Sequence, residues 1–267
     1  MGATRRSVPV IAADRHDAGP VRLGFLYPGH AAEDDYPAVA AMLGPQVVVE
    51  VVHTGMGEDA HREDALLEIG GRDRLRPGAK ELQARGVDVG VWACTSGSFV
   101  FGWDGARAQV DALSQDLGAP ASSTSFAFVS ALAALGITRV AVAATYPADV
   151  AQRFATFLDH AGVAVLATGS QGIVTAAEVG TLDADATVGF VAAGDHPEAQ
   201  AILVPDTALH TVRLLDRLEA RVGKPVLTAN QVTVFEALRL SGRTARADGL
   251  GTLFAAGTSE PVTQPGR

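Results

Sequence analysis

The chain has 267 residues, and an average of about 150 residues per domain predicts one large or two small domains. Hydrophobic residues make up 48% and charged residues 19%, which is the composition of a folded globular protein. The formal net charge of −9 argues against nucleic acid or an anionic membrane surface as a partner. The single cysteine, Cys94, excludes an intramolecular disulfide and a multi-cysteine metal site, and it favours a cytoplasmic location.

The two ends of the chain are predicted to be loose tails. In residues 1–20 the apolar stretch is broken by Pro9 and Asp14, so no signal-peptide core forms. Residues 255–267 combine Pro, Gly, Ser and Thr without periodicity. No apolar run approaches the roughly 18 residues of a membrane span. We therefore expect a folded part over about residues 21–254 and no membrane segment.

Short apolar runs alternate with helix-length amphipathic segments along this folded part. In chain order the predicted strands and the helices after them are VRLGFLY then 33–43, VVVEVVH then 60–85, VDVGVWA then 104–117, ITRVAVAA then 148–161, VAVLAT then 174–182, AILV then 208–222, and PVLTA then 231–240. Alternating units with nearly continuous apolar strands are typical of parallel sheets covered by helices on both faces. The predicted fold class is α/β.

The two halves of the chain resemble each other. VRLGFLYP (21–28) matches TRVAVAATYP (138–147), DVGVWACTSGSF (88–99) matches QAILVPDTALHT (200–211), and residues 118–136 match residues 223–242 in the same order. Any two strand-helix-strand stretches share some likeness, but three matches in one order favour a duplication. We predict two pseudo-symmetric Rossmann-like lobes with a cleft between them. Residues 21–122 plus 228–254 form the first lobe and residues 123–227 the second.

Cys94 lies where a predicted strand ends and a helical segment begins. Ligands of open α/β sheets bind outside the carboxyl ends of the strands, where helix N-termini offer N–H groups and a positive field. That field is expected to lower the pKa of a cysteine toward the range where thiolate is present. A lone cysteine is often only a small buried hydrophobe, but the polar run Thr95-Ser96-Gly97-Ser98 favours a functional role.

Asp206 and Thr207 occupy the equivalent place in the second half. An Asp before a helix is commonly an N-cap, but the duplication places this one opposite Cys94. A thiol and a carboxyl group that face each other across a cleft can divide the donor and acceptor roles of a proton transfer. Cys94 and Asp206 are therefore the predicted catalytic pair.

Two further segments are expected to border the cleft. Tyr146 follows the first strand of the second half, and its hydroxyl is predicted to donate a hydrogen bond to a substrate carboxylate. The loop Pro28-Gly29-His30 holds the same place in the first half, and Gly29 permits close approach of the backbone. A turn residue and a solvated histidine are the alternatives. Weaker candidates at later strand ends are Thr124, Ser125, Thr228 and Asn230.

No metal or organic cofactor is expected. The segment from His53 to Asp64 contains histidines and carboxylates, but it lacks a recognisable ligand spacing, and a loop before an acidic helix N-terminus explains it better. The chain also lacks a GxGxxG after a strand, a GxxxxGK[ST], a GxSxG and an HExxH motif. These absences favour a cofactor-free enzyme.

Ala93-Cys94-Thr95-Ser96 with Ser98-Phe99, the polar residue before Thr207, and Tyr146 beside Pro147 resemble the aspartate/glutamate racemase superfamily. The maleate cis-trans isomerase and arylmalonate decarboxylase branch is the most similar, over about residues 21–250. The resemblance implies a two-lobed α/β homo-oligomer that uses cysteines from both lobes on a small carboxylate without a cofactor. It makes Cys94 the first-lobe thiol and has Thr95 and Ser96 hold a carboxylate.

The sequence departs from that family at three places. Asp206 stands where the second-lobe thiol is usual, and Pro28-Gly29-His30-Ala31 replaces the usual Pro-Ser-Ser-Asn loop. The order Tyr146-Pro147 is also inverted. These departures leave the substrate and the reaction open.

Three functions are therefore considered. The first is an isomerase or racemase-like enzyme in which the Cys94 thiolate attacks or deprotonates a small carboxylic acid and Asp206 is the complementary acid or base. The second is a decarboxylase of a malonate-like acid, with Cys94 as the proton donor. The third is a catalytically silent protein that binds a small carboxylate.

Overall fold

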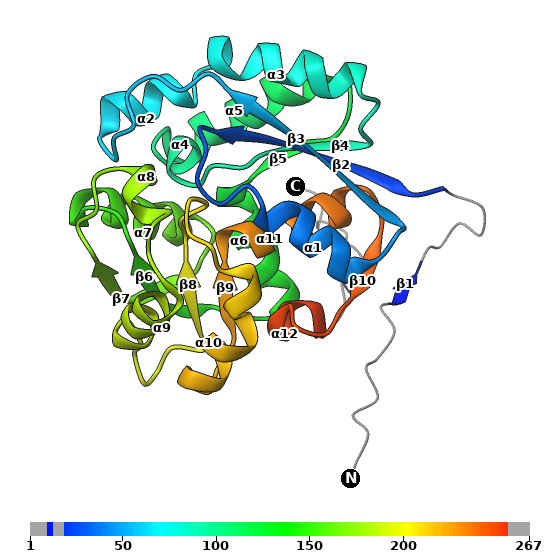
Figure 1. The fold of residues 1–267 in the computed structure, drawn as a ribbon. Coiled ribbons are helices and arrows are strands. Elements are labelled where there is room, and N and C mark those ends of the chain that lie inside the picture. Colours follow the sequence, from blue (N-terminus) through cyan, green and yellow to red (C-terminus); the bar gives the residue numbers. More distant parts are fainter. Residues whose placement is uncertain (1–9, 13–18, 256–267) are drawn as a thin grey trace.

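The computed structural model describes residues 10–12 and 19–255 (Figure 1). The elements of the first half are β1 (Val10–Ala12), β2 (Val21–Pro28), α1 (Asp35–Leu43), β3 (Val47–Thr54), α2 (Glu63–Ile69), α3 (Arg72–Ala84), β4 (Val89–Trp92), α4 (Ser96–Phe99), α5 (Gly102–Leu117), β5 (Ala121–Ser123) and α6 (Thr124–Leu135). Those of the second half are β6 (Arg139–Ala144), α7 (Ala148–His160), β7 (Ala164–Ser170), α8 (Ala176–Val179), α9 (Ala184–Ala193), β8 (Ala201–Val204), the 3₁₀ helix η1 (Val212–Leu214), α10 (Leu215–Val222), β9 (Val226–Thr228), α11 (Ala229–Leu240), β10 (Thr244–Arg246) and α12 (Gly251–Ala255).

Each half of the chain builds one four-stranded parallel sheet. The strand order is β3-β2-β4-β5 in the first sheet and β7-β6-β8-β9 in the second, so both sheets use their four strands in the same spatial order. This common order confirms the predicted α/β class with two similar lobes. In the first sheet Leu26 pairs with Trp92, which brings the carboxyl ends of β2 and β4 together immediately before Cys94.

The central strands are covered on both faces. Every residue of β4 and of β8 is buried, as expected for short apolar strands inside a parallel sheet. Helices α3 and α5 pack against one face of the first sheet, and α1 and α11 pack against the other (Figure 1). Among the helices of residues 10–12 and 19–255, none combines the length and apolarity needed to cross a bilayer.

Helices α6 and α11 join the two halves. They pack along each other, and α11 also contacts β2, β4 and β5 of the first sheet although it follows β9 of the second. This packing supports the assignment of residues 228–254 to the first lobe. The lobe boundaries at residues 122 and 228 stay a proposal.

Several elements differ from the prediction. Within the predicted N-terminal tail, Val10–Ala12 forms β1, which pairs antiparallel with β10. The predicted helix 174–182 is reduced to the short α8, and α9 was not predicted. The helix predicted from residue 208 begins only with η1 at Val212, because residues 205–211 form the loop that carries Asp206. The remaining residues of the two predicted tails, apart from Gly19, Pro20 and Ala255, lie outside the described residues.

The helix predicted over 60–85 is divided into α2 and α3 at Gly70 and Gly71. A Cβ atom on Gly70 would lie 2.1 Å from the carbonyl oxygen of Gly97, so this position requires glycine. The amide of Gln109 donates to the carbonyls of both Gly70 (2.7 Å) and Gly97 (2.8 Å). This close approach holds the end of α2 against α4, the short helix that follows Cys94.

Candidate active site

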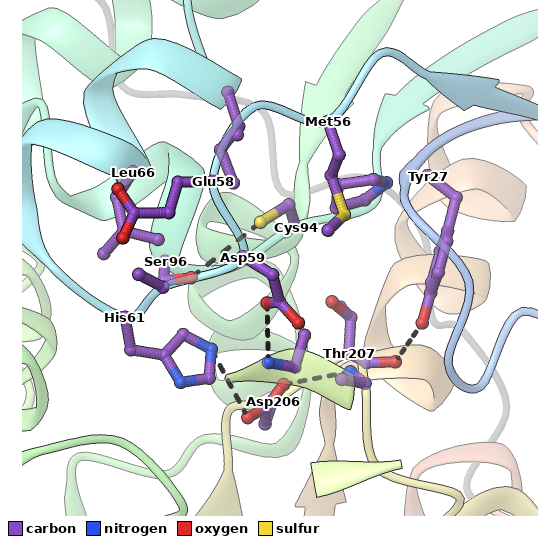
Figure 2. Close-up of a pocket in the computed structure, with 15 residues that line it drawn as sticks. Tyr27, Met56, Glu58, Asp59, His61, Leu66, Cys94, Ser96, Asp206 and Thr207 are labelled. Carbon is purple, nitrogen blue, oxygen red and sulfur yellow. Dashed lines mark hydrogen bonds and ion pairs between the residues drawn. The ribbon is translucent and has the colours of Figure 1, made fainter. Parts of the chain in front are cut away.

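A pocket of about 450 Å³, including the space open to solvent, lies where the carboxyl ends of β2 and β4 face the carboxyl end of β8 (Figure 2). Of the predicted site residues, the pocket brings together Cys94, Ser96, Asp206, Thr207 and Pro28. It is lined in full by Tyr27, Pro28, Met56, Glu58, Asp59, Ala60, His61, Leu66, Ile69, Cys94, Ser96, Ala176, Asp206, Thr207 and Ala208.

The Cys94 thiol is buried in the wall formed by β4 and α4. Its Sγ atom accepts a hydrogen bond from the backbone N–H of Gly97 (3.3 Å) and lies 3.8 Å from the Ser96 hydroxyl. Burial raises the pKa of this thiol to about 11, and the nearby charge of Asp206 acts in the same direction. The expected lowering of the pKa is therefore wrong, because desolvation outweighs the hydrogen bonds from the short α4. At neutral pH Cys94 is a protonated thiol.

Asp206 follows β8 and is 3% exposed. One carboxylate oxygen accepts a hydrogen bond from the N–H of Ala208 (2.9 Å), and the other accepts one from the hydroxyl of Thr145. The next helical element begins only at Val212, so Asp206 is not the N-cap that the simpler interpretation predicted. Its carboxylate is held by a turn and by the end of β6, and it faces the pocket.

His61 is a pocket residue that was predicted only to lie at the start of the helix over 60–85. The chain between β3 and α2 crosses to the second lobe, where the N–H of His61 donates to the carbonyl of Val174 and the carboxylate of Asp59 accepts from the N–H groups of Ala176 and Ala177. His61 is 8% exposed, and its Nε2 atom lies 4.0 Å from an oxygen of Asp206 (Figure 2). No local signal predicts this burial, because the partners of His61 lie more than a hundred residues away in the chain.

Tyr27 and Thr207 connect the two lobes at the opposite side of the pocket. The Tyr27 hydroxyl donates to the carbonyl of Thr207 (2.9 Å) and accepts from the N–H of Ala32 (3.0 Å). Burial raises the pKa of Tyr27 well above its usual range, so the phenol stays protonated and keeps donating. The Thr207 backbone is thereby fixed next to Asp206.

Tyr146 and Thr95 do not line the pocket. The Tyr146 hydroxyl donates to the carbonyl of Pro205, whereas the prediction had it donating to a substrate carboxylate. Its ring packs edge-on against His61, with 4.8 Å between the ring centroids. Thr95 is 1% exposed, and its carbonyl accepts from the hydroxyl of Ser125 (2.9 Å). Both residues are buried behind the pocket wall, so they are supporting residues and do not contact a ligand.

Gly29 and His30 also lie outside the pocket lining, although Pro28 belongs to it. Gly29 has a φ of +65°, and a Cβ there would meet the sulfur of Met56, so this turn does require glycine. The His30 side chain is exposed and contacts Glu33 at 3.0 Å. His30, Glu33 and His53 hold metal-ligating atoms within 4.8 Å of one another, a grouping that the sequence spacing did not predict.

The four weaker candidates are buried supporting residues. Thr124 hydrogen-bonds Thr233 (2.7 Å), and Thr228 forms a capping box with Gln231 at the start of α11. The side-chain amide of Asn230 donates to Asp35 (3.0 Å) and to the carbonyl of Thr207 (3.2 Å). None of the four residues belongs to the pocket lining.

The pocket lining mixes apolar and acidic residues. Pro28, Met56, Leu66 and Ile69 contribute apolar surface, whereas Glu58, Asp59 and Asp206 contribute carboxylates and His61 an imidazole. Neither lysine nor arginine lines the pocket within the described part of the chain. Glu58 binds Arg62 with two hydrogen bonds of 3.0 and 2.8 Å, and Asp59 caps α8. Asp206 is left facing His61.

Comparisons with known proteins show the family and the fold. The arylmalonate decarboxylase family model matches residues 23–254. Arylmalonate decarboxylase of Bordetella bronchiseptica is 31% identical over 225 residues, which cover 82% of this chain and 90% of that protein. A liganded arylmalonate decarboxylase with a Gly-to-Cys and a Cys-to-Ser substitution superposes with a TM-score of 0.79 and 28% identity, covering 88% of this chain and 99% of that one. The maleate isomerase of Pseudomonas putida S16 has the same fold, with a TM-score of 0.81 at 23% identity over 88% of this chain and 99% of that one. The chain belongs to the arylmalonate decarboxylase family.

Proposed function

We propose that this protein is a cofactor-independent decarboxylase of small malonate-type dicarboxylic acids, with Cys94 as the proton donor. The observation that carries the proposal is the buried thiol in the pocket wall, whose pKa of about 11 keeps it protonated. A protonated thiol suits a general acid better than the nucleophile or base of the isomerase hypothesis. Family membership supports the same choice, because the relative from Bordetella bronchiseptica is an arylmalonate decarboxylase.

The reaction divides into two steps. The bond between the α-carbon and one carboxylate breaks, CO₂ leaves, and the electron pair stays on the substrate as an enediolate of the remaining carboxylate. The Cys94 thiol then transfers its proton to the α-carbon, which gives the monocarboxylate and a thiolate. A proton from water restores the thiol. In sum, one dianion and one proton give CO₂ and one monoanion.

The pocket lining supports a substrate with one apolar substituent. Met56, Leu66 and Ile69 provide an apolar surface, and the hydroxyl groups of Ser96 and Thr207 are available to hold the retained carboxylate. Because fixed hydroxyl donors stabilise charge most where it accumulates, they favour the enediolate over the starting carboxylate. The substrate class is therefore a malonate that carries an aryl or alkyl group.

Purified protein incubated with phenylmalonate and alkylmalonates tests this function. We expect release of one equivalent of CO₂ and, in heavy water, one deuterium at the α-carbon of the product. The Cys94→Ala variant should release CO₂ at least about a hundredfold more slowly, the usual lower bound for a lost general acid. Absence of CO₂ release across the panel would exclude the proposal.

The isomerase hypothesis keeps one supporting observation. The N–H of Gly97 donates to the Cys94 sulfur, a bond that would stabilise a thiolate once a base had removed the proton. Isomerisation of maleate without CO₂ release would favour this reaction over decarboxylation. Since the family consists of enzymes by name and the thiol lies in the pocket, a silent carboxylate-binding protein is the least favoured of the three hypotheses.

Two expectations from the sequence stay predictions. The protein is expected to be a homo-oligomer, which size-exclusion chromatography with light scattering would test. It is also expected to be cytoplasmic, on the basis of its single cysteine.

A further inference from the structure

Three metal-ligating side chains meet at the carboxyl edge of the first sheet, outside the pocket lining. His53 is the next-to-last residue of β3, and His30 and Glu33 belong to the segment that connects β2 to α1. Strands β2 and β3 are parallel neighbours and pair up to their last residues, so this segment leaves β2 beside His53. The positive φ of Gly29 places a turn at that point.

Both imidazoles approach the same carboxylate oxygen. Nδ1 of His30 lies 3.0 Å from Oε1 of Glu33, and Nε2 of His53 lies 3.4 Å from it. The two rings lie beside each other, with 4.1 Å between their centroids. The other oxygen of Glu33 accepts a hydrogen bond from the N–H of Ala31 (2.8 Å), which orients the carboxylate. Oε1 is thereby directed to the two histidines.

These separations are close to those of ligands around a tetrahedral zinc ion. With metal–ligand bonds of about 2.0–2.1 Å, a tetrahedral ion holds its ligand atoms roughly 3.3–3.4 Å apart. The ligand atoms of all three residues lie within 4.8 Å of one another. The side chain of His30 is 74% exposed, so its ring has room to turn and bring the third pair of atoms to the same separation.

An ordinary surface ion pair is a different arrangement. His210 and Asp34 form such a pair, with 2.9 Å between Nε2 and a carboxylate oxygen, and a pair of this kind contributes little to stability. At Glu33 a second imidazole approaches the same oxygen. Among the residues that the structure describes, His30, Glu33 and His53 are the one group of three whose ligand atoms come this close.

We propose that His30, Glu33 and His53 bind a Zn²⁺ ion. Two imidazole nitrogens and one carboxylate are a usual zinc ligand set, whereas Mg²⁺ and Ca²⁺ prefer oxygen ligands. Water fills the fourth position, since the site is open to solvent. The ion joins the segment after β2 to the end of β3, directly after Pro28 of the pocket lining. It takes no part in the decarboxylation proposed above.

Calorimetry with Zn²⁺ tests the site on the full chain without an affinity tag, after EDTA has removed bound metal. We expect one Zn²⁺ per chain with a Kd in the micromolar range or tighter, and no binding of Mg²⁺. His53→Ala and Glu33→Gln should each raise Kd at least about tenfold, because losing a ligand costs no less than losing the hydrogen-bond partner of a ligand. Absence of Zn²⁺ binding, or an unchanged Kd in both variants, would overturn the inference.

His210→Ala is the matched control. The side chains of His210 and His53 are similarly exposed, at 41% and 38%, and both lie near a carboxylate, but His210 belongs to no group of three among the described residues. We expect His210→Ala and Cys94→Ala to bind Zn²⁺ as the wild type does. Equal weakening in His210→Ala and His53→Ala would indicate scattered surface binding and refute the site. Loss of binding in Cys94→Ala would place the ion in the pocket and refute it as well.

Two further readouts locate the ion and need no substrate, so they are decided independently of the proposed decarboxylation. Zn²⁺ should raise the Tm of the wild type more than that of Glu33→Gln, because a ligand of the folded state stabilises it. Equal increases in Tm would contradict the site. A crystal grown with Zn²⁺ should show an anomalous peak at the zinc absorption edge between His30, Glu33 and His53. A crystal without a peak there would show that the proposal is wrong.

Discussion

The phenol of Tyr27 donates a 2.9 Å hydrogen bond to the carbonyl of Thr207, although 180 residues separate them in the chain. Tyr27 is the next-to-last residue of β2 in the first sheet, and Thr207 lies just after β8 of the second. The same hydroxyl accepts a hydrogen bond from the N–H of Ala32. The buried Tyr27 oxygen thus bonds a donor in the first lobe and an acceptor in the second. The contact ties β2 of the first lobe to the loop that carries Asp206.

Tyr27→Phe should lower the free energy of unfolding by about 1–3 kcal/mol, because two buried backbone groups lose a partner. It should also reduce kcat/KM by more than stability alone would explain, since the Thr207 loop is released. Urea denaturation and steady-state kinetics measure the two effects. Ser122→Ala is the matched control: it removes a buried hydroxyl bond to Glu236 away from the pocket, so it should cost stability without changing KM.

Cys94→Ser should retain less than about one hundredth of the wild-type rate, because a hydroxyl is a far weaker acid than a thiol and general acids contribute about 10²–10⁴. Since Cys94 is the single cysteine of the chain, no second thiol can take over. Turnover of a malonate followed by CO₂ release measures this loss. Full activity of Cys94→Ser would show that the proton comes from another group.

Stability should decline at alkaline pH because of Cys94. The folded pKa of about 11 lies above the ordinary value of 9.0, so the folded state binds the proton more tightly than the unfolded state. The associated stability is present below pH 9 and is lost as the pH rises from 9 to 11, amounting to about 2–3 kcal/mol.

Urea unfolding of wild type and Cys94→Ala at pH 8 and at pH 10.5 isolates this effect. We expect the difference in unfolding free energy between the two proteins to shrink at the higher pH. Thiolate absorbance near 240 nm, with the alanine variant as the blank, should show a midpoint near 11. A midpoint near 9 would contradict the buried thiol.

Gly70→Ala should unfold more easily by at least about 2 kcal/mol, because the new methyl group would lie 2.1 Å from the carbonyl oxygen of Gly97. Separation of α2 from α4 should also lower activity, as both border the wall of Cys94. Gly189→Ala in α9 is the control: nothing lies within 4 Å of its Cβ, and the helix should gain up to about 1 kcal/mol. Equal stability of the two variants would refute the close contact.

The sequence determined the architecture because apolar strands and amphipathic helices are local patterns. The run VDVGVWA predicts a buried strand, and β4 is buried at every residue. The likeness of the two halves predicts two sheets with one strand order, which the structure shows. Cys94 and Asp206 could be placed opposite each other because each follows the corresponding strand of one of the two similar halves, and ligands of open α/β sheets bind outside the carboxyl ends of the strands.

Only the tertiary structure decided the chemistry of these groups. Cys94 has the elevated pKa of a buried thiol because lobe packing desolvates it, and no local pattern reports desolvation. The Tyr146 hydroxyl donates to the carbonyl of Pro205. The His61 ring contacts Ile173 and Asp206 of the other lobe. Such contacts depend on how the two lobes pack against each other. The sequence therefore predicts which residues lie at the strand ends, whereas the packing of the lobes determines which side chains face the pocket.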